Sequence, residues 1–242
     1  MVLLHGVGLD HTMWERVVPG IGARHRVHTP DLRGHGTAPD AAPGTSLEDL
    51  AEDVADLVAR LPGRAHVVGF SLGALVATEL ALDHPGLVRS LTLVSGVANR
   101  SAAERGAVVG RLRAARADLE ATYRAAVDRW FSPGWSAGEP GLADRVLATL
   151  RANRPSSYLA CYALFATADA ELWPRLPDLH LPVHAITGSD DPGSTPAMST
   201  AVAARVRNGR CTVVPGARHL LPLERPAAVV DAVLTHTQGA LR

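Results

Sequence analysis

The chain has 242 residues, of which 47% are hydrophobic, and its 24 Lys and Arg side chains are balanced by 24 Asp and Glu. A chain of this size can bury a large core, but a formal charge of zero provides no basic surface for nucleic acid or an anionic membrane. No apolar run reaches the ~18 residues of a membrane span, and no signal-like segment precedes Val2. Cys161 and Cys211 lack metal-ligand or CxxC spacing. We therefore expect a cytoplasmic, soluble protein with free thiols that acts on a small molecule; its oligomeric state is left open.

Short β-like runs alternate with helical patterns along the chain, which is typical of a parallel sheet with covering helices. The best-marked helix covers residues 47–61, where Thr45 and Glu48 predict a capping box and Pro62-Gly63 predicts the end. About six strands are expected, at residues 2–4, 26–29, 66–68, 91–94, 183–187 and 211–214.

The alternation stops after the strand ending near Val94. Helical stretches without a convincing strand follow, at residues 101–116, 119–131, 142–151 and 156–167. We expect a helical cap over the carboxyl edge of the sheet, where open α/β sheets bind ligands. A separate helical domain is the alternative, which the resumption of the βα pattern disfavours. The predicted organisation is core at 1–97, cap at 98–178 and core again at 179–242.

A strand that turns directly into a helix through Gly69-Phe70-Ser71-Leu72-Gly73 predicts a nucleophile elbow. The sharp turn would force Ser71 to a positive φ and would leave space only for glycine two residues to either side. An incidental serine in a glycine-spaced turn is the alternative reading of the motif alone.

A serine nucleophile needs a base and a carboxylate that orients the base, and both are expected after later strands. Gly188-Ser189-Asp190-Asp191-Pro192 follows one strand, and Gly216-Ala217-Arg218-His219 follows the next. We predict His219 as the base and Asp191 as the acid. Asp191 is preferred to Asp190 because Pro192 fixes the adjacent backbone. The order Ser, Asp, His is the order found in hydrolases.

The oxyanion formed during acyl transfer needs two amide donors. One predicted donor is the amide of Leu72, at the start of the helix that follows Ser71. The other is the amide of Val7, in the glycine-containing loop His5-Gly6-Val7-Gly8 after the first strand.

These motifs resemble the α/β-hydrolase superfamily along the whole chain, and within it most of all the 3-oxoadipate enol-lactonases. The segments that carry the resemblance are residues 3–10 with Met13-Trp14, 31–36, 69–73, 129–133, 158–161 before Asp169, 188–192 and 216–219. It implies that the loop with Asp31, Arg33 and His35 is mostly structural. The chain departs from the lactonases at Gly73-Ala74, where they usually have two glycines, and after His219-Leu220, where they typically have a polar residue.

Members of the superfamily generally carry two further strands before the first strand seen here. Either the start codon is placed late or the fold tolerates their loss. The resemblance then places residues 26–29 at an exposed sheet edge, where His25, Arg26 and His28 would discourage pairing.

The predicted function is a serine hydrolase that cleaves an ester or lactone without a metal or organic cofactor. Residues 100–154 hold ten arginines and six acids, which suits a carboxylate-bearing substrate. General carboxylesterase, carbon–carbon bond hydrolase of ring-cleavage products and non-catalytic binding protein remain alternatives. Serine at position 71 excludes the dehalogenase and epoxide-hydrolase chemistry of the superfamily, which requires aspartate. Each candidate for the substrate pocket could equally pack inside the cap; the candidates are Trp130, Trp135, Tyr158, Tyr162 and Arg129.

Overall fold

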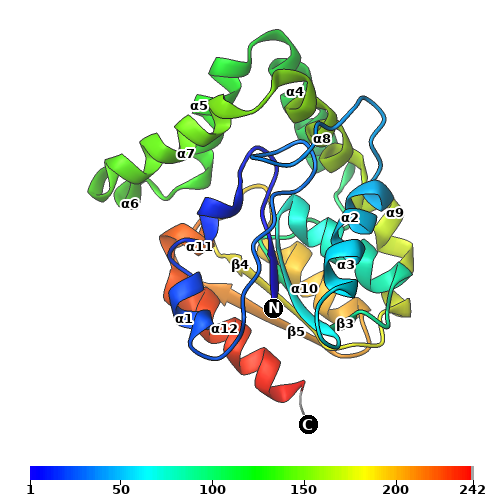
Figure 1. The fold of residues 1–242 in the computed structure, drawn as a ribbon. Helices are drawn as coiled ribbons and strands as arrows, with labels where there is room; N and C mark the ends of the chain where they lie inside the picture. The colour runs from blue at the N-terminus through cyan, green and yellow to red at the C-terminus, as the bar shows by residue number, and fades with distance from the viewer. Residues whose placement is uncertain (241–242) are drawn as a thin grey trace.

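The structure is a computed structural model that describes residues 1–240, except for the side chains at positions 136, 137 and 140. Its centre is one sheet of five parallel strands whose spatial order follows the sequence. The strands are β1 (Val2–Leu4), β2 (Ala65–Phe70), β3 (Val88–Val94), β4 (Val183–Gly188) and β5 (Gly209–Val214). Because all strands are parallel, their carboxyl ends meet at one edge of the sheet (Figure 1).

The expected strand at residues 26–29 is reduced to a single parallel bridge between Val2 and His28, so the sheet has five strands rather than about six. The His28 amide donates to the Met1 carbonyl over 2.9 Å, and the Leu3 amide donates to the His28 carbonyl over 2.9 Å. Pro30 has no amide hydrogen to continue the ladder. No other described segment forms a bridge with residues 26–29, so within the chain they form the expected edge.

Helices cover both faces of the sheet. The helices α1 (Val18–Gly22) and α12 (Pro226–Gly239) pack together on one face, and α2 (Leu47–Ala59), α3 (Leu72–Asp83) and α10 (Pro196–Arg205) contact the strands or one another on the other. A short 3-10 helix, η1 (His11–Trp14), follows the loop after β1.

The start of α2 differs from the expected capping. Ser46, not Thr45, accepts the hydrogen bond from the Asp49 amide over 3.0 Å, and the Asp49 carboxylate accepts from the Ser46 amide over 2.8 Å. The predicted partner Glu48 takes no part. Thr and Ser can both cap a helix, and here they are adjacent, so the sequence does not decide which of the two is the N-cap residue.

Between β3 and β4 lies a segment of five helices, called the helical segment below: α4 (Ala102–Ala117), α5 (Leu119–Trp130), α6 (Pro133–Gly138), α7 (Pro140–Ala152) and α8 (Pro155–Thr167). Four correspond to the expected helices, and α6 is additional. They lie at the top of Figure 1, beyond the carboxyl ends of the strands. The chain returns to β4 through α9 (Asp169–Leu172), which contacts α3, and η2 (Trp173–Asp178), which contacts α10.

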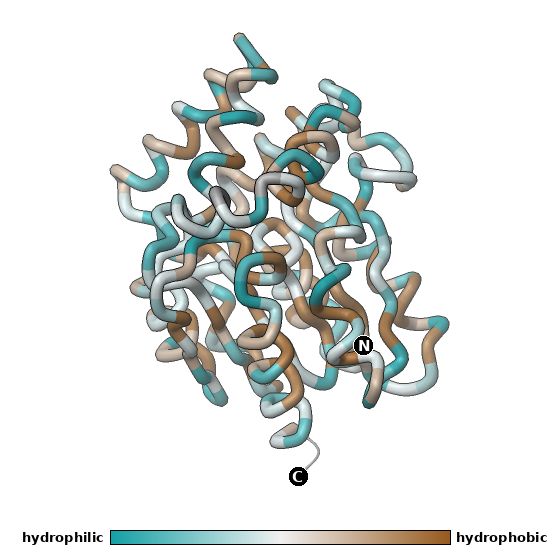
Figure 2. The backbone as a smooth tube through the Cα atoms, turned by 90° about the vertical axis from the view of Figure 1, so that its left-hand side faces the viewer, coloured by the Kyte–Doolittle hydropathy of each residue, from teal (hydrophilic) through white to brown (hydrophobic). Residues whose placement is uncertain are grey.

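The hydrophobic core runs through the sheet and its flanking helices. Hydrophobic stretches of the chain, brown in Figure 2, recur through the body of the molecule. Of the described helices, none combines the length and the apolar character needed to cross a bilayer. Both cysteines are free thiols, as expected, with Cys161 buried and Cys211 exposed. A short four-residue helix, α11 (Leu221–Glu224), precedes α12.

Candidate active site

Ser71 occupies the turn between β2 and α3 with φ 52° and ψ −110°, a conformation that side chains rarely adopt. A Cβ on Gly69 would lie 2.2 Å from the Gly73 carbonyl oxygen, and a Cβ on Gly73 would lie 2.3 Å from the Leu4 carbonyl oxygen. Only glycine fits at both positions, because the obstructing atoms belong to the backbone. The strained turn that the GFSLG motif predicts is therefore present.

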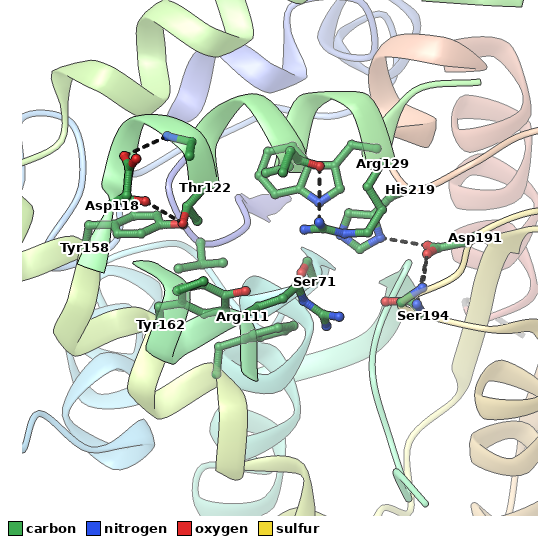
Figure 3. A pocket seen from close by; sticks show the side chains of 18 of the residues that line it. Ser71, Arg111, Asp118, Thr122, Arg129, Tyr158, Tyr162, Asp191, Ser194 and His219 are labelled. Carbon is green, nitrogen blue, oxygen red and sulfur yellow. Dashed lines mark hydrogen bonds and ion pairs between the residues drawn. The ribbon is translucent and has the colours of Figure 1, made fainter. Parts of the chain in front are cut away.

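Ser71 lines a cavity of about 440 Å³, whose other lining residues come from loops at the carboxyl edge of the sheet and from α4, α5 and α8. The same cavity is lined by Val7, Asp191 and His219. Figure 3 shows Ser71 beside His219, with Asp191 on the other side of the imidazole. Three side chains far apart in the sequence are thus brought to one place.

His219 is held by a buried carboxylate. Its Nδ1 lies 2.7 Å from Asp191 Oδ2, and Asp191 is only 3% exposed. The other oxygen, Oδ1, accepts from the amides of Gly193 over 2.8 Å and Ser194 over 2.9 Å. Because the carboxylate can only accept, Nδ1 carries the proton and Nε2 keeps a free lone pair. Asp190, the competing candidate, is exposed and accepts from the Ser189 hydroxyl over 2.6 Å.

Ser95 and Phe70, which the sequence analysis did not assign, and the pocket candidate Trp130 also surround His219. The buried Ser95 hydroxyl donates to the His219 carbonyl over 2.8 Å. The Phe70 ring lies 4.9 Å from the imidazole, and the Trp130 ring lies 5.9 Å from it, between centroids. Their signal in the sequence is weak: Phe70 adjoins the serine in the motif, but nothing in the sequence distinguishes Ser95 from other serines after strands.

The two amides expected to form an oxyanion hole are at the carboxyl ends of β1 and β2. Val7 lines the cavity, and its N–H donates to no described backbone or side-chain atom. Leu72 is the first residue of α3, where a helix leaves its amides unpaired and favours negative charge. The side chain of Leu72 is fully buried and does not line the cavity.

His5 fixes the loop that carries Val7. Its Nε2 accepts from the Leu32 amide over 2.8 Å, so its Nδ1 must carry the proton that it donates to the Gly6 carbonyl over 2.9 Å. Burial lowers the pKa of His5 to about 4, which keeps this neutral tautomer near pH 7.

Of the five candidates for a substrate pocket, four line the cavity: Trp130, Tyr158, Tyr162 and Arg129. The fifth, Trp135, lies away from it. Its indole stacks on the Phe131 ring at 4.8 Å and 15°, with the Arg16 guanidinium 5.8 Å from the ring centroid. The rotation of the short helix α6 about its axis, which the sequence does not specify, turns the Trp135 side chain away from the cavity.

Two further arginines line the cavity that the sequence analysis did not single out. Arg100 is buried and pairs with Asp169 over 2.7 Å. Arg111, on α4, forms no ion pair or hydrogen bond with the described residues. Burial lowers the pKa of Arg129, and the charge of Arg111 lowers it further.

The loop with Asp31 has a structural role, as the resemblance implies. Asp31 accepts hydrogen bonds from the His11 amide over 2.9 Å and from the Thr37 amide over 2.9 Å. Burial opposes ionisation, but these bonds prevail and lower the pKa of Asp31 to about 2. Within residues 1–240, no three His, Cys, Asp or Glu side chains are grouped as metal ligands would be.

Several proteins of assigned function are similar to the chain over nearly its full length. A (E)-2-((N-methylformamido)methylene)succinate hydrolase of Acinetobacter baylyi is 30% identical over 96% of the chain and 88% of the relative. A pimeloyl-[acyl-carrier protein] methyl ester esterase of Aeromonas hydrophila subsp. hydrophila is 31% identical over 99% and 95%. The 3-oxoadipate enol-lactonase 1 of Acinetobacter baylyi is 30% identical over 96% and 85%.

Solved structures show the same fold. The enol-lactonase from Burkholderia xenovorans LB400 superposes with a TM-score of 0.88 at 26% identity, over 98% of this chain and 90% of that one. The resemblance to enol-lactonases that the sequence motifs indicate is thereby confirmed. Residues 1–232 match the alpha/beta hydrolase family, whose named relatives here are hydrolases, an esterase and lactonases. The chain therefore belongs to the alpha/beta hydrolase family.

Proposed function

We propose that the protein is a serine hydrolase that cleaves a carboxylic ester or lactone through Ser71, His219 and Asp191. One observation carries the proposal: a serine on a strained turn lines the same cavity as an imidazole whose Nδ1 is bound by a buried carboxylate over 2.7 Å. A hydroxyl becomes a nucleophile when a neighbouring base takes its proton, and the carboxylate keeps that base in the required tautomer.

The proposed reaction has two halves. His219 Nε2 takes the Ser71 proton as the hydroxyl oxygen attacks the carbonyl carbon, and the Val7 and Leu72 amides donate to the oxyanion. The carbon–oxygen bond to the leaving group then breaks, and the imidazolium returns the proton to the departing oxygen. His219 then takes a proton from water as the water oxygen attacks the acyl carbon, the bond from that carbon to Ser71 Oγ breaks, and the imidazolium returns the proton to Ser71 Oγ. With an enol-lactone, the leaving group would be an enolate, which is more stable than an alkoxide.

We further propose that residues 98–178 act as a cap that selects the substrate, and that residues 1–97 and 179–242 form the catalytic core. The cavity walls support this role, because helices α4, α5 and α8 supply most of them. Arg129 and the aromatic residues Trp130, Tyr158 and Tyr162 suit a small substrate that carries a carboxylate. Among substrates of this kind we favour a lactone related to those of the enol-lactonases, since an enol-lactonase sequence matches 96% of the chain and an enol-lactonase structure matches 98%.

The test uses a short p-nitrophenyl ester and three forms of the protein. Wild type should hydrolyse it, and Ser71→Ala should lose essentially all activity. Asp191→Asn should lower kcat by ~10³–10⁴-fold, because the imidazole would then favour the wrong tautomer. Thermal unfolding of each variant checks that the fold persists. Undiminished hydrolysis by folded Ser71→Ala would rule the proposed mechanism out.

Lactone and ester cleavage are separated by comparing kcat/KM for an enol-lactone with that for simple alkyl esters. A higher value for the lactone is expected. A value well below that for esters would leave a general carboxylesterase as the better description.

A further inference from the structure

Two arginines that line the cavity have no ion-pair partner among residues 1–240. Arg111 comes from α4 and Arg129 from α5, two successive helices joined at Asp118. In Figure 3 both lie in the part of the cavity that holds Ser71 and His219. Neither forms an ion pair with any carboxylate of the described residues.

The acidic residues that line or adjoin the cavity are already engaged. Asp169 binds Arg100 over 2.7 Å, and Asp191 binds His219 over 2.7 Å. Asp118, at the far end, accepts from the Ala121 amide over 2.9 Å and so caps α5. Arg129 finds one weak partner, the Ala125 carbonyl at 3.2 Å, and Arg111 finds none within the described chain.

Two half-buried guanidinium groups that face one space without an anion are unfavourable unless something negative binds there. The charge of Arg111 acts on Arg129, since together with burial it lowers the pKa of that side chain. Arginines elsewhere on the same two helices behave differently: Arg113 points to solvent, and Arg124 pairs with Glu120 over 2.7 Å.

We propose that Arg111 and Arg129 form one anion subsite that binds a free carboxylate of the substrate, next to the ester or lactone group that Ser71 attacks. This inference rests on the proposed hydrolase function and names the substrate class as half-esters or lactones of dicarboxylic acids. A planar carboxylate matches the fork of donors on each guanidinium.

The walls around the two arginines fit such a substrate. Tyr158 and Tyr162 line the same cavity, and their hydroxyls have no hydrogen-bond partner among the described residues. Burial raises the pKa of Tyr158, so its hydroxyl stays protonated and can only donate to an anion as a neutral group. A cavity of about 440 Å³ admits a small dicarboxylate derivative together with its hydrolysable group.

Binding tests the subsite separately from chemistry. Ser71→Ala, which keeps the cavity but cannot react, is titrated with glutarate by calorimetry. We expect binding that weakens at least tenfold in Ser71→Ala/Arg111→Ala and in Ser71→Ala/Arg129→Ala, and that is unchanged in the matched control Ser71→Ala/Arg113→Ala. Equal weakening in the control, or no weakening in the first two, overturns the proposal. Inorganic phosphate that binds more tightly than glutarate overturns the assignment to a carboxylate.

Selectivity is the second measurement. Mono-p-nitrophenyl glutarate and p-nitrophenyl valerate have the same acyl chain length and differ by the terminal carboxylate. Wild type should have the higher kcat/KM for the charged ester, and the ratio of the two values should fall at least tenfold in Arg111→Ala and in Arg129→Ala. Arg111→Lys should restore part of the ratio, and Arg113→Ala should not alter it. A ratio that does not change in Arg111→Ala counts against the subsite.

The two proposals fail in different ways. Absence of hydrolysis by the wild type removes the hydrolase function, while the glutarate titration still decides the subsite. If hydrolysis depends on Ser71 but kcat/KM does not depend on the terminal carboxylate of the substrate, the hydrolase function stands and the proposed subsite is ruled out.

Discussion

Ser71 holds a backbone conformation that costs a non-glycine residue about 1–3 kcal/mol. The neighbouring structure maintains it: the Ser71 amide donates to the Val94 carbonyl over 3.0 Å, and Gly69 and Gly73 admit the backbone atoms that cross there. The strain turns the hydroxyl away from the sheet into the cavity. The strained turn therefore lowers the stability of the fold and, in return, places the Ser71 hydroxyl oxygen in the cavity.

Replacing Ser71 by glycine should stabilise the protein while abolishing hydrolysis. Glycine adopts φ 52° without strain, and its greater freedom in the unfolded chain offsets only ~0.5–1 kcal/mol of the gain. We expect the free energy of unfolding of Ser71→Gly to be about 1 kcal/mol higher than that of Ser71→Ala, which keeps the Cβ. Urea unfolding of the two variants measures the difference, and a less stable Ser71→Gly would mean that the turn is not strained.

At this scale the sequence predicts what lies in motifs and misses what depends on packing. Asp191 could be chosen over Asp190 because of Pro192, and the structure brings it to His219. The sequence does not show that Arg111 lines the cavity and Trp135 does not, because the rotation of a helix about its axis decides which of two nearby side chains, such as Arg111 and Arg113, faces the cavity. Composition indicated an excess of arginine in the segment but not which arginines lack a partner.

The helical segment forms hydrogen bonds with two loops of the candidate active site, the loop after β1 that carries Val7 and the loop after β5 that carries His219. Asn153, at the end of α7, donates to the Gly8 carbonyl over 2.8 Å, next to Val7. Arg218, beside His219, donates to the carbonyls of Asp128 and Phe131 at the end of α5, each over 3.3 Å. A cation is favoured at that helix end. The helical segment and the loops that carry Val7 and His219 therefore share hydrogen bonds as well as a cavity.

Arg218→Ala should lower kcat by about tenfold, because the loop that carries His219 loses two of its bonds to α5 and the imidazole is less well positioned. The loss should be equal for p-nitrophenyl valerate and mono-p-nitrophenyl glutarate, unlike that of Arg111→Ala. Arg218→Lys should recover part of kcat. Steady-state kinetics with both esters provide the test, and a loss confined to the charged ester would assign Arg218 to substrate binding instead.

Elements were easier to predict than their ends. The apolar runs between helical patterns identified every strand of the sheet. Four of these strands are buried along nearly their whole length, whereas residues 210–213 of β5 are exposed. The run at residues 26–29 failed because its neighbour β1 is three residues long and offers few partners. Helix α6 escaped notice because six residues with two glycines give little periodic signal.

Across the whole molecule, several histidines are buried in the neutral form. Burial is the main cause that lowers the pKa of His35 to about 3, and of His5, His66 and His236 to about 4. In the unfolded chain these groups titrate near 6.5. Between these values the unfolded chain binds more protons than the folded one, so the free energy of unfolding falls as the pH falls.

We therefore expect stability to drop steeply as the pH is lowered from about 6.5 to about 4. Each pKa unit corresponds to about 1.4 kcal/mol, and His5 is fully buried, so the loss is large against a typical stability of ~5–15 kcal/mol. Urea midpoints measured across this range provide the test. His236→Gln should reduce the pH dependence, and the same change at exposed His180 should not. A flat profile would show that the histidines are accessible to protons in the folded state.

The hydrogen bonds between the helical segment and the loops after β1 and β5 mostly end on main-chain carbonyls. The acceptors are the carbonyls of Gly8, Asp128 and Phe131, together with that of Trp130, which accepts from the Leu220 amide over 3.2 Å. Such acceptors exist whatever side chain stands at the position. Substitutions among the residues that line the cavity can therefore accumulate while these hydrogen bonds persist. A helical segment joined in this way is exchangeable, so one hydrolase can acquire new specificities in evolution without its sheet being rebuilt.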